Sequence, residues 1–267
     1  MTGILERGTA AIRYSDGGGS GRPVILTHGA GMDSASFAAQ AEAVQDAGFR
    51  SIRWDLRAHG ASTLAPGARF TAQDALADLG ALIDELRLES PVLVGHSLGG
   101  NLSQAYVRTQ PGRASGLIAV GTTWNTGPLG RGERFGLRMA APLLRLIPGA
   151  KLPALMADAS AVTPEAVESI RATFARMPKS VFLEVWRATA SFVAPDPEYR
   201  SPVPLGLVVG AEDRTGNIRT AMQAWADAEG VRLHAIPAAG HVVMADAPDE
   251  TSAAIVGILR EWDAAAR

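Results

Sequence analysis

The chain has 267 residues, 47% of which are hydrophobic, and a formal net charge of −2 at pH 7. This length allows a single α/β domain with a large buried core, and the lack of a basic patch argues against a nucleic-acid partner. Because the chain contains no cysteine, disulfides, thiolate metal sites and a cysteine nucleophile are excluded.

The first residues, M-T-G-I-L-E-R-G-T, include no apolar segment of the kind found in a secretory signal. No apolar run approaches the roughly 18 residues that cross a bilayer. The sequence therefore predicts a cytoplasmic protein without a membrane partner.

Short apolar runs alternate with helical patterns in the first 123 residues. The apolar runs predict strands at residues 10–15, 23–27, 49–54, 91–95 and 116–121. The helical patterns, two of which begin at capping residues, cover residues 33–47, 71–87 and 98–110. A helix thus follows each of the three middle strands.

The alternation stops at residue 124. Up to residue 201 we expect helices only, at residues 133–146, 163–175 and 178–193. Strands then alternate with helices again, at residues 203–210, 217–229, 231–236 and 248–264.

This order of elements predicts an α/β fold, with a mostly parallel central sheet and helices on both faces. The core is expected to consist of residues 1–123 and 202–267, and residues 124–201 to form an inserted helical cap. Ligands of such sheets bind at the carboxyl ends of the strands. We therefore expect the cap to cover a site formed by the loops that follow the strands.

The stretch G-H-S-L-G at residues 95–99 places Ser97 between a predicted strand and a predicted helix. Gly95 and Gly99 have no side chains, so a strand and a helix can approach closely around a strained turn. This turn lifts the serine clear of the sheet. A serine hydroxyl is a weak nucleophile, so this interpretation requires a neighbouring base and a carboxylate that orients the base.

His241 is the predicted base, because it follows the strand at 231–236 and precedes the final helix. The other four histidines have other expected places: His28 braces its loop, and His59 lies in a polar loop. His96 neighbours the serine but points away from it, and His234 packs within a strand.

The predicted carboxylate is Asp213, in the stretch G-A-E-D-R-T-G that follows the strand at 203–210. Glu212 is the alternative in the same loop, and Asp is also common in ordinary turns. The loop after residue 121 has no carboxylate before Glu133, which favours Asp213. The chain order is then Ser97, Asp213, His241.

With these motifs in place, the chain resembles the α/β-hydrolase family, in its capped, esterase-like branch. The resemblance covers nearly the whole chain, and its motifs are H-G-A-G at 28–31, D-L-R-A-H-G-A-S at 55–62, G-H-S-L-G-G at 95–100, G-A-E-D at 210–213 and G-H at 240–241. It implies an oxyanion hole formed by the backbone N–H groups of Ala30 and Leu98. It also implies a structural loop at 55–62 and a reaction without metal or organic cofactor.

The expected function is a serine hydrolase that cleaves carboxylic esters or lactones through an acyl-enzyme on Ser97. A carbon–carbon bond hydrolase, a perhydrolase and a non-catalytic small-ligand receptor of the same fold remain as alternatives. Dehalogenases and epoxide hydrolases of this fold use aspartate as nucleophile, and Ser97 argues against both.

Apolar side chains of the predicted cap favour an apolar small-molecule substrate. Those singled out as substrate-binding are Trp124, Met139, Phe182 and Trp186. A homodimer is compatible with the sequence, which does not require one.

Overall fold

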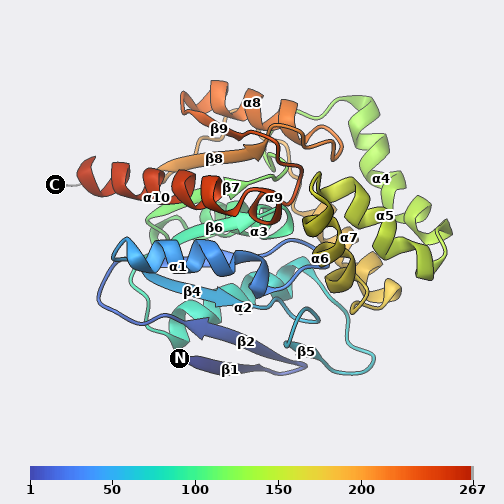
Figure 1. Cartoon of the computed structure of the whole chain (residues 1–267), viewed down its shortest axis with the longest axis horizontal. Coiled ribbons are helices and arrows are strands. Elements are labelled where there is room, and N and C mark those ends of the chain that lie inside the picture. The colour runs from blue at the N-terminus through green and yellow to red at the C-terminus, as the bar shows by residue number, and fades with distance from the viewer. Residues whose placement is uncertain (266–267) are drawn as a thin grey trace.

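Alternation of apolar strands with amphipathic helices produces a nine-stranded sheet in the computed structural model, which describes residues 1–265 apart from the side chain of Arg138. The strand order is β1-β2-β4-β3-β6-β7-β8-β9, and β5 pairs with β2 (Figure 1). The strands are β1 Thr2–Arg7, β2 Ala10–Asp16, β3 Pro23–Thr27, β4 Arg50–Trp54, β5 Thr63–Leu64, β6 Val92–His96, β7 Gly116–Val120, β8 Leu205–Gly210 and β9 Leu233–Ile236.

Six strands from β4 to β9 in this order run parallel, whereas β1, β2 and β5 pair in the antiparallel sense. The predicted mostly parallel sheet is therefore confirmed. The sequence prediction missed β1, which pairs only with β2 among the described strands, and the two-residue β5. Neither is a fully buried apolar run, so neither gives the signal that marks the central strands.

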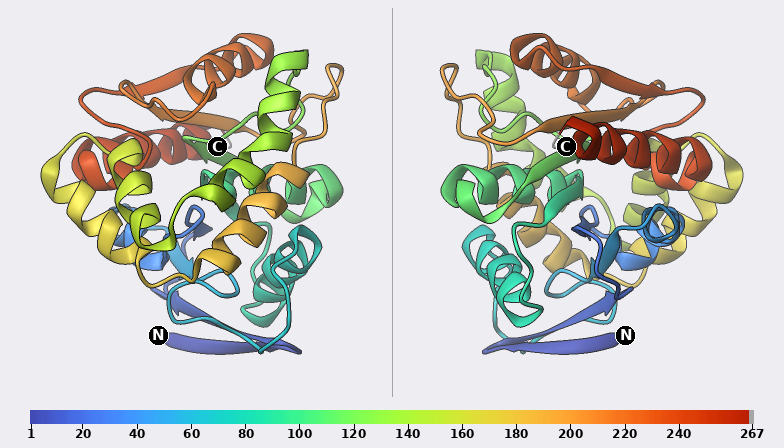
Figure 2. Two further views of the ribbon diagram at one scale, coloured as in Figure 1. Left: turned by 90° about the vertical axis from the view of Figure 1, so that its right-hand side faces the viewer. Right: turned by 90° about the vertical axis from the view of Figure 1, so that its left-hand side faces the viewer.

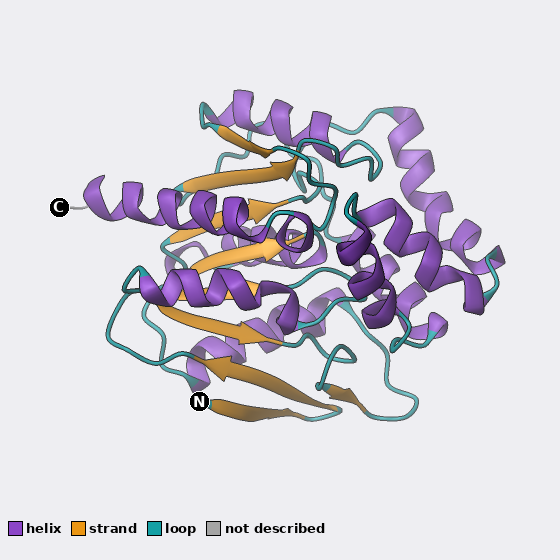
Figure 3. Cartoon of the chain, viewed as in Figure 1, coloured by secondary structure: helices purple, strands orange, loops and turns teal. Residues whose placement is uncertain are grey.

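Helices cover both faces of the sheet (Figures 1 and 3). They are α1 Ala38–Asp46, α2 Ala72–Glu85, α3 Leu98–Thr109, α4 Arg131–Leu146, α5 Leu152–Ser160, α6 Pro164–Phe174, α7 Lys179–Ser191, α8 Ile218–Glu229, α9 Val243–Asp246 and α10 Pro248–Ala265. Short 3₁₀ turns lie at Ser34–Phe37, Pro111–Arg113 and Gly149–Lys151. None of the helices in residues 1–265 is both long and apolar enough to cross a membrane.

The core has two halves because successive side chains of a strand point to opposite faces. On β6, Leu93 packs in the cluster that includes side chains of α2, α3 and α8, whereas Val92 and Val94 pack in the cluster with α1 and α10. In Figure 1, α1 and α10 lie in front of the sheet and α2 and α3 behind it. The predicted arrangement of helices on both faces is thus confirmed.

Four helices, α4 to α7, lie between β7 and β8 and gather beyond the carboxyl ends of the strands (Figures 1 and 2). We call residues 124–201 the helical insertion, and their separation as a cap domain stays a prediction. The sequence predicted α4, α6 and α7 but missed α5. Thr163 caps α6 by accepting a hydrogen bond from the Ala166 N–H, as its position before Pro164 indicates.

Candidate active site

Ser97 sits on a strained turn between β6 and α3. Its backbone has φ 49° and ψ −114°, a conformation that side-chain-bearing residues rarely adopt. A Cβ on Gly95 would lie 2.2 Å from the carbonyl oxygen of Gly99, and a Cβ on Gly99 would lie 2.2 Å from that of Thr27. Both positions therefore require glycine, which is the geometric reason for the G-x-S-x-G spacing.

His241 and Asp213, predicted from separate loops, form a direct hydrogen bond. His241 Nδ1 lies 2.9 Å from Asp213 Oδ2, and both side chains are buried. A carboxylate only accepts, so Nδ1 carries the proton of this hydrogen bond. Burial raises the pKa of Asp213, but the hydrogen bond and charge of His241 and the Thr215 N–H outweigh this effect, and the net pKa is lowered. Asp213 is therefore a carboxylate at neutral pH.

His96 joins the turn of Ser97 to the loop of His241. Its Nε2–H donates to the His241 carbonyl oxygen over 3.0 Å, and the centroids of the two imidazole rings are 4.8 Å apart. The turn itself is held by the Ser97 N–H, which donates to Val120, and by the Thr122 hydroxyl, which donates to the Ser97 carbonyl. Ser97 is half-buried, and within residues 1–265 its hydroxyl makes no hydrogen bond.

The H-G-A-G loop lies against the same turn. A Cβ on Gly29 would approach the Ser97 Cβ to 3.2 Å, which places the next residue, Ala30, close to the serine. Among the described residues, neither the Ala30 N–H nor the Leu98 N–H donates a hydrogen bond. These two donors are the pair expected to form an oxyanion hole, and that role stays a prediction.

Three further histidines serve as internal braces. His28 is buried, holds the Gly29 carbonyl through Nδ1, and accepts the Leu56 N–H through Nε2. Its pKa is lowered by burial. Burial also lowers the pKa values of His59 and His96 to about 3, so both rings are neutral at neutral pH. The bracing role predicted for His28 fits these contacts.

The loop at 55–62 is held by its own charges. Asp55 accepts hydrogen bonds from the N–H groups of Ser34 and Ala61, and the Arg57 guanidinium pairs with both oxygens of Asp78 at 2.7 and 2.8 Å. Within residues 1–265, none of these side chains forms a hydrogen bond with the Ser97 hydroxyl. The contacts agree with the structural role that the resemblance implies.

The four residues predicted to bind substrate come from three parts of the helical insertion, and two of them, Phe182 and Trp186, pack against each other on α7. Trp124 is buried and its ring stacks on that of Trp225, with centroids 6.1 Å apart. Phe182 is buried between Phe174 and Trp186, at 5.5 and 6.1 Å. Met139 is half-buried on α4. The contacts of Trp124 and Phe182 are those of packing residues, and substrate binding by the four stays a prediction.

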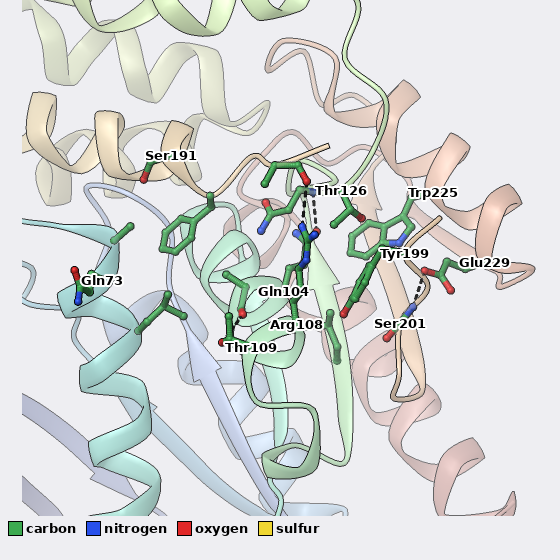
Figure 4. Close-up of a pocket in the computed structure, with 17 residues that line it drawn as sticks. Gln73, Gln104, Arg108, Thr109, Thr126, Ser191, Tyr199, Ser201, Trp225 and Glu229 are labelled. Atoms are coloured by element: carbon green, nitrogen blue, oxygen red, sulfur yellow. Dashed lines mark hydrogen bonds between the residues drawn. The ribbon is translucent and has the colours of Figure 1, made fainter. Parts of the chain in front are cut away.

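A cavity of about 430 Å³ lies away from Ser97, between α2, α3 and α8 (Figure 4). Its apolar lining includes Leu76, Phe192 and Trp225. Arg108 borders it and pairs with Asp196 at 2.8 Å. Neither Ser97, Asp213 nor His241 lines this cavity, so its size carries no information about the substrate of the serine.

Sequence reasoning missed Asp246, which ties the helical insertion to the loop of His241. Its carboxylate accepts hydrogen bonds from the N–H groups of Gly240 and Thr163 at 2.8 Å and of Val162 at 3.1 Å, and from the Thr163 hydroxyl at 2.9 Å. The Val242 N–H also donates to the Ser160 carbonyl. Such a link depends on chain segments that meet only after folding.

No group of three or more His, Cys, Asp or Glu side chains in residues 1–265 is placed to hold a metal ion. A serine hydroxyl and a histidine–carboxylate pair on adjoining loops are the groups that nucleophilic catalysis by serine requires.

Comparison with known proteins agrees with this geometry. Residues 24–254 match the model of the alpha/beta hydrolase family. The chain is 42% identical over 98 residues to a non-heme chloroperoxidase from Kitasatospora aureofaciens, an alignment that spans 36% of this chain and 34% of that protein. The alignments with these and other curated relatives cover between 32% and 46% of the relatives' own length, so the matched part is less than half of each relative.

Two solved structures resemble the whole chain. A thermophilic esterase from Thermogutta terrifontis superposes with a TM-score of 0.80, 27% identity and 98% coverage of both chains. An enol-lactonase from Burkholderia xenovorans superposes with a TM-score of 0.80, 20% identity and coverage of 97% and 100%. The second likeness shows the fold alone.

Proposed function

The chain belongs to the alpha/beta hydrolase family, and we propose that it is a serine hydrolase that cleaves carboxylic esters or lactones of apolar small molecules through an acyl-enzyme on Ser97. The observation that carries this proposal is the 2.9 Å hydrogen bond between His241 and Asp213 on loops that adjoin the strained turn of Ser97. The likeness to an esterase at 27% identity over nearly the whole chain supports it.

In the proposed reaction, His241 Nε2 takes the hydroxyl proton of Ser97 as the serine oxygen attacks the carbonyl carbon of the ester. Asp213 keeps the imidazole in the tautomer with the proton on Nδ1 and stabilises the imidazolium as it forms. Its lowered pKa supports this role, because the group must stay ionised.

The carbonyl oxygen becomes negatively charged in this step. We assign its stabilisation to the free N–H groups of Ala30 and Leu98, the latter at the N-terminus of α3 where the helix dipole favours negative charge. His241 then returns its proton to the departing alcohol. Water repeats the sequence on the acyl-enzyme and releases the carboxylic acid.

Perhydrolysis is a second candidate on the same residues. Hydrogen peroxide would replace water as the acceptor of the acyl group, and the product would be a peracid and the free serine. The 42% identity over 98 residues to a protein named a non-heme chloroperoxidase supports this second candidate.

The test follows the release of p-nitrophenol from p-nitrophenyl esters, from acetate to decanoate, by the wild type and Ser97→Ala. We expect kcat of the variant to fall at least about 10³-fold. The acyl chain length that the wild type hydrolyses fastest reports the size of the acyl pocket. Ser169→Ala, a serine exposed on α6, serves as the control and keeps wild-type activity. Mass spectrometry after reaction with a fluorophosphonate is expected to find the label on Ser97.

A folded protein that hydrolyses no ester or lactone and leaves Ser97 unlabelled would contradict the proposal. Labelling of Ser97 without ester turnover would redirect it to carbon–carbon bond cleavage. Peracid formed from an ester and hydrogen peroxide, at a rate above that of hydrolysis, would favour the second candidate.

A further inference from the structure

The outer side of α4 carries large apolar side chains in solvent. Phe135, Leu143 and Leu146 have 66%, 56% and 79% of their surfaces exposed. Spacings of eight and eleven residues from Phe135 bring them to one side of a helix with 3.6 residues per turn, and Met139 and Pro142 fall on the same side. We call these five residues the apolar stripe of α4.

The orientation of α4 is fixed by its other side. Ala141 is buried, and Leu144 packs against the buried cluster beneath the helix. At the C-terminal end, the Lys179 ammonium of α7 donates to the carbonyl oxygens of Arg145 and Ile147. In the left view of Figure 2, α4 crosses the side of the molecule that faces the viewer. Phe135, Leu143 and Leu146 therefore point outward from the protein, whereas Met139 on the same side is half-buried.

Positive charge flanks the stripe. Arg134 and Arg145, eleven residues apart, follow one edge of it, and Arg131 stands one turn before Phe135; all three are exposed. The helix has four arginines and one acidic residue, Glu133, although the whole chain has a net charge of −2. The Glu133 carboxylate is occupied by the Gly130 N–H and the Asn217 amide.

We propose that this face of α4 docks on an anionic lipid surface, with the apolar stripe in the interface and the arginines at the headgroup phosphates. A helix with an apolar side, an arginine-rich side and low mean hydropathy is the type that lies in the plane of a membrane surface. The sequence prediction of no membrane partner rested on the lack of a membrane-spanning segment. Peripheral docking does not require such a segment. Docking is independent of the proposed ester chemistry.

A second copy of the chain is the weaker occupant. An antiparallel two-fold contact through this face would bring the same surface of each copy together and place the arginine edges of the two helices side by side, so that arginines would approach arginines. A surface of anionic headgroups instead supplies the opposite charge along the edge of the stripe, with each cation contributing about fivefold to binding.

The experiment measures flotation of the full chain with vesicles of phosphatidylcholine alone and of an equal mixture of phosphatidylcholine and phosphatidylglycerol. We expect binding to the mixed vesicles and loss of binding at high salt. Phe135→Ser is expected to weaken binding about tenfold, as the loss of one aromatic side chain from an apolar interface does. Arg131→Glu is expected to weaken it at least about fivefold.

Matched controls change the same residue types elsewhere. Ile4→Ser, on the edge strand β1 with 47% exposure, and Arg260→Glu, exposed on α10, keep wild-type binding. Because Phe135 and Arg131 are exposed, their variants keep the wild-type thermal unfolding temperature. Absence of wild-type binding, or Phe135→Ser binding as tightly as wild type, would overturn the proposal. A wild-type dimer in sedimentation that Phe135→Ser dissociates, without vesicle binding, would assign the face to a second copy and also overturn it.

Discussion

The loop of His241 and the helix α4 both lie beyond the carboxyl ends of the strands, and they are held in opposite ways (Figure 1). The loop is fixed by directional bonds from several segments: Asp213, His96, Ser160 and Asp246 all bond to residues 240–242. The outer side of α4 instead presents side chains with more than half of their surface in solvent.

This difference separates two kinds of task. A group that transfers a proton needs its atoms placed to a fraction of an ångström, which hydrogen bonds from several directions achieve. A surface that meets a partner of variable shape needs apolar area and charge, whose effects are not directional. The loss of activity after a substitution in the loop should therefore depend sharply on which residue is replaced. The loss of vesicle binding after a substitution on α4 should instead scale with the apolar area or charge that is removed.

The largest expected effect comes from Asp213→Asn. The amide leaves the size of the side chain unchanged but favours the wrong tautomer of His241, and we expect kcat for ester hydrolysis to fall about 10⁴-fold. Glu212→Gln, at the exposed neighbouring carboxylate, keeps kcat within about twofold. Steady-state kinetics on both variants checks this. Equal losses of kcat at the two positions would contradict a specific role for Asp213.

Asp78→Ala is expected to have the next largest effect, on stability. The side chains of Asp78 and Arg57 are 0% and 4% exposed, so removing the carboxylate leaves a buried guanidinium short of its partner, at a cost of about 3–5 kcal/mol of unfolding free energy. Asp74, at 3.2 Å from the same guanidinium but 47% exposed, is the control. Asp74→Ala is expected to cost less than about 1 kcal/mol in urea denaturation.

Two buried histidines predict the pH dependence of stability. The pKa values of His59 and His96 are about 3 in the folded protein and about 6.5 in the unfolded chain. Between these values the unfolded chain binds the protons and the folded protein does not, so the unfolding free energy falls as pH falls. Each histidine contributes at most about 1.4 kcal/mol per pH unit.

Urea denaturation at several pH values from about 6 to about 4 measures this slope. His59→Phe is expected to flatten it by the share of one histidine, whatever the variant does to stability at neutral pH. His234→Gln, at a half-buried position, is expected to change the slope less. An unchanged slope in His59→Phe would show that His59 is protonated in the folded protein.

These predictions draw on residues that the sequence identified to different degrees. Ser97, Asp213 and His241 were predicted because each follows a predicted strand, and parallel strands bring their carboxyl ends to one edge of the sheet. Gly95 and Gly99 were found because close backbone approach leaves a local pattern in the sequence. Such local signals predicted the sheet and the histidine–carboxylate pair.

Other features leave no local signal. The sequence predicted a helix at 133–146 but not which of its sides faces solvent, because both sides contain apolar residues. Trp124 was predicted to bind substrate, and the structure stacks its ring on Trp225 of α8, about a hundred positions along the chain. Val162 and Thr163, two of the partners of Asp246, likewise lie some eighty residues away in the chain.

Asp246 joins the loop of His241 to the segment that precedes α6, and its substitution is expected to affect both stability and activity. In Asp246→Asn an NH₂ group replaces one oxygen and faces N–H donors of Gly240, Val162 or Thr163. We expect a loss of about 1–3 kcal/mol of unfolding free energy and a fall of about tenfold in kcat/KM, equivalent to 1.4 kcal/mol of barrier. Asp249→Asn, exposed in the first turn of α10, is the control.

The division of that tenfold between kcat and KM sharpens the comparison. If Asp246 acts mainly through Gly240, it positions His241, and kcat falls while KM stays constant. If it acts mainly through Val162 and Thr163, it holds the insertion over the substrate, and KM rises while kcat stays constant. We expect the fall in kcat, because the bond to Gly240 lies next to His241, the proposed base, whereas the insertion is also held by the Val242–Ser160 bond and by the 2.8 Å pair of Arg176 with Asp33.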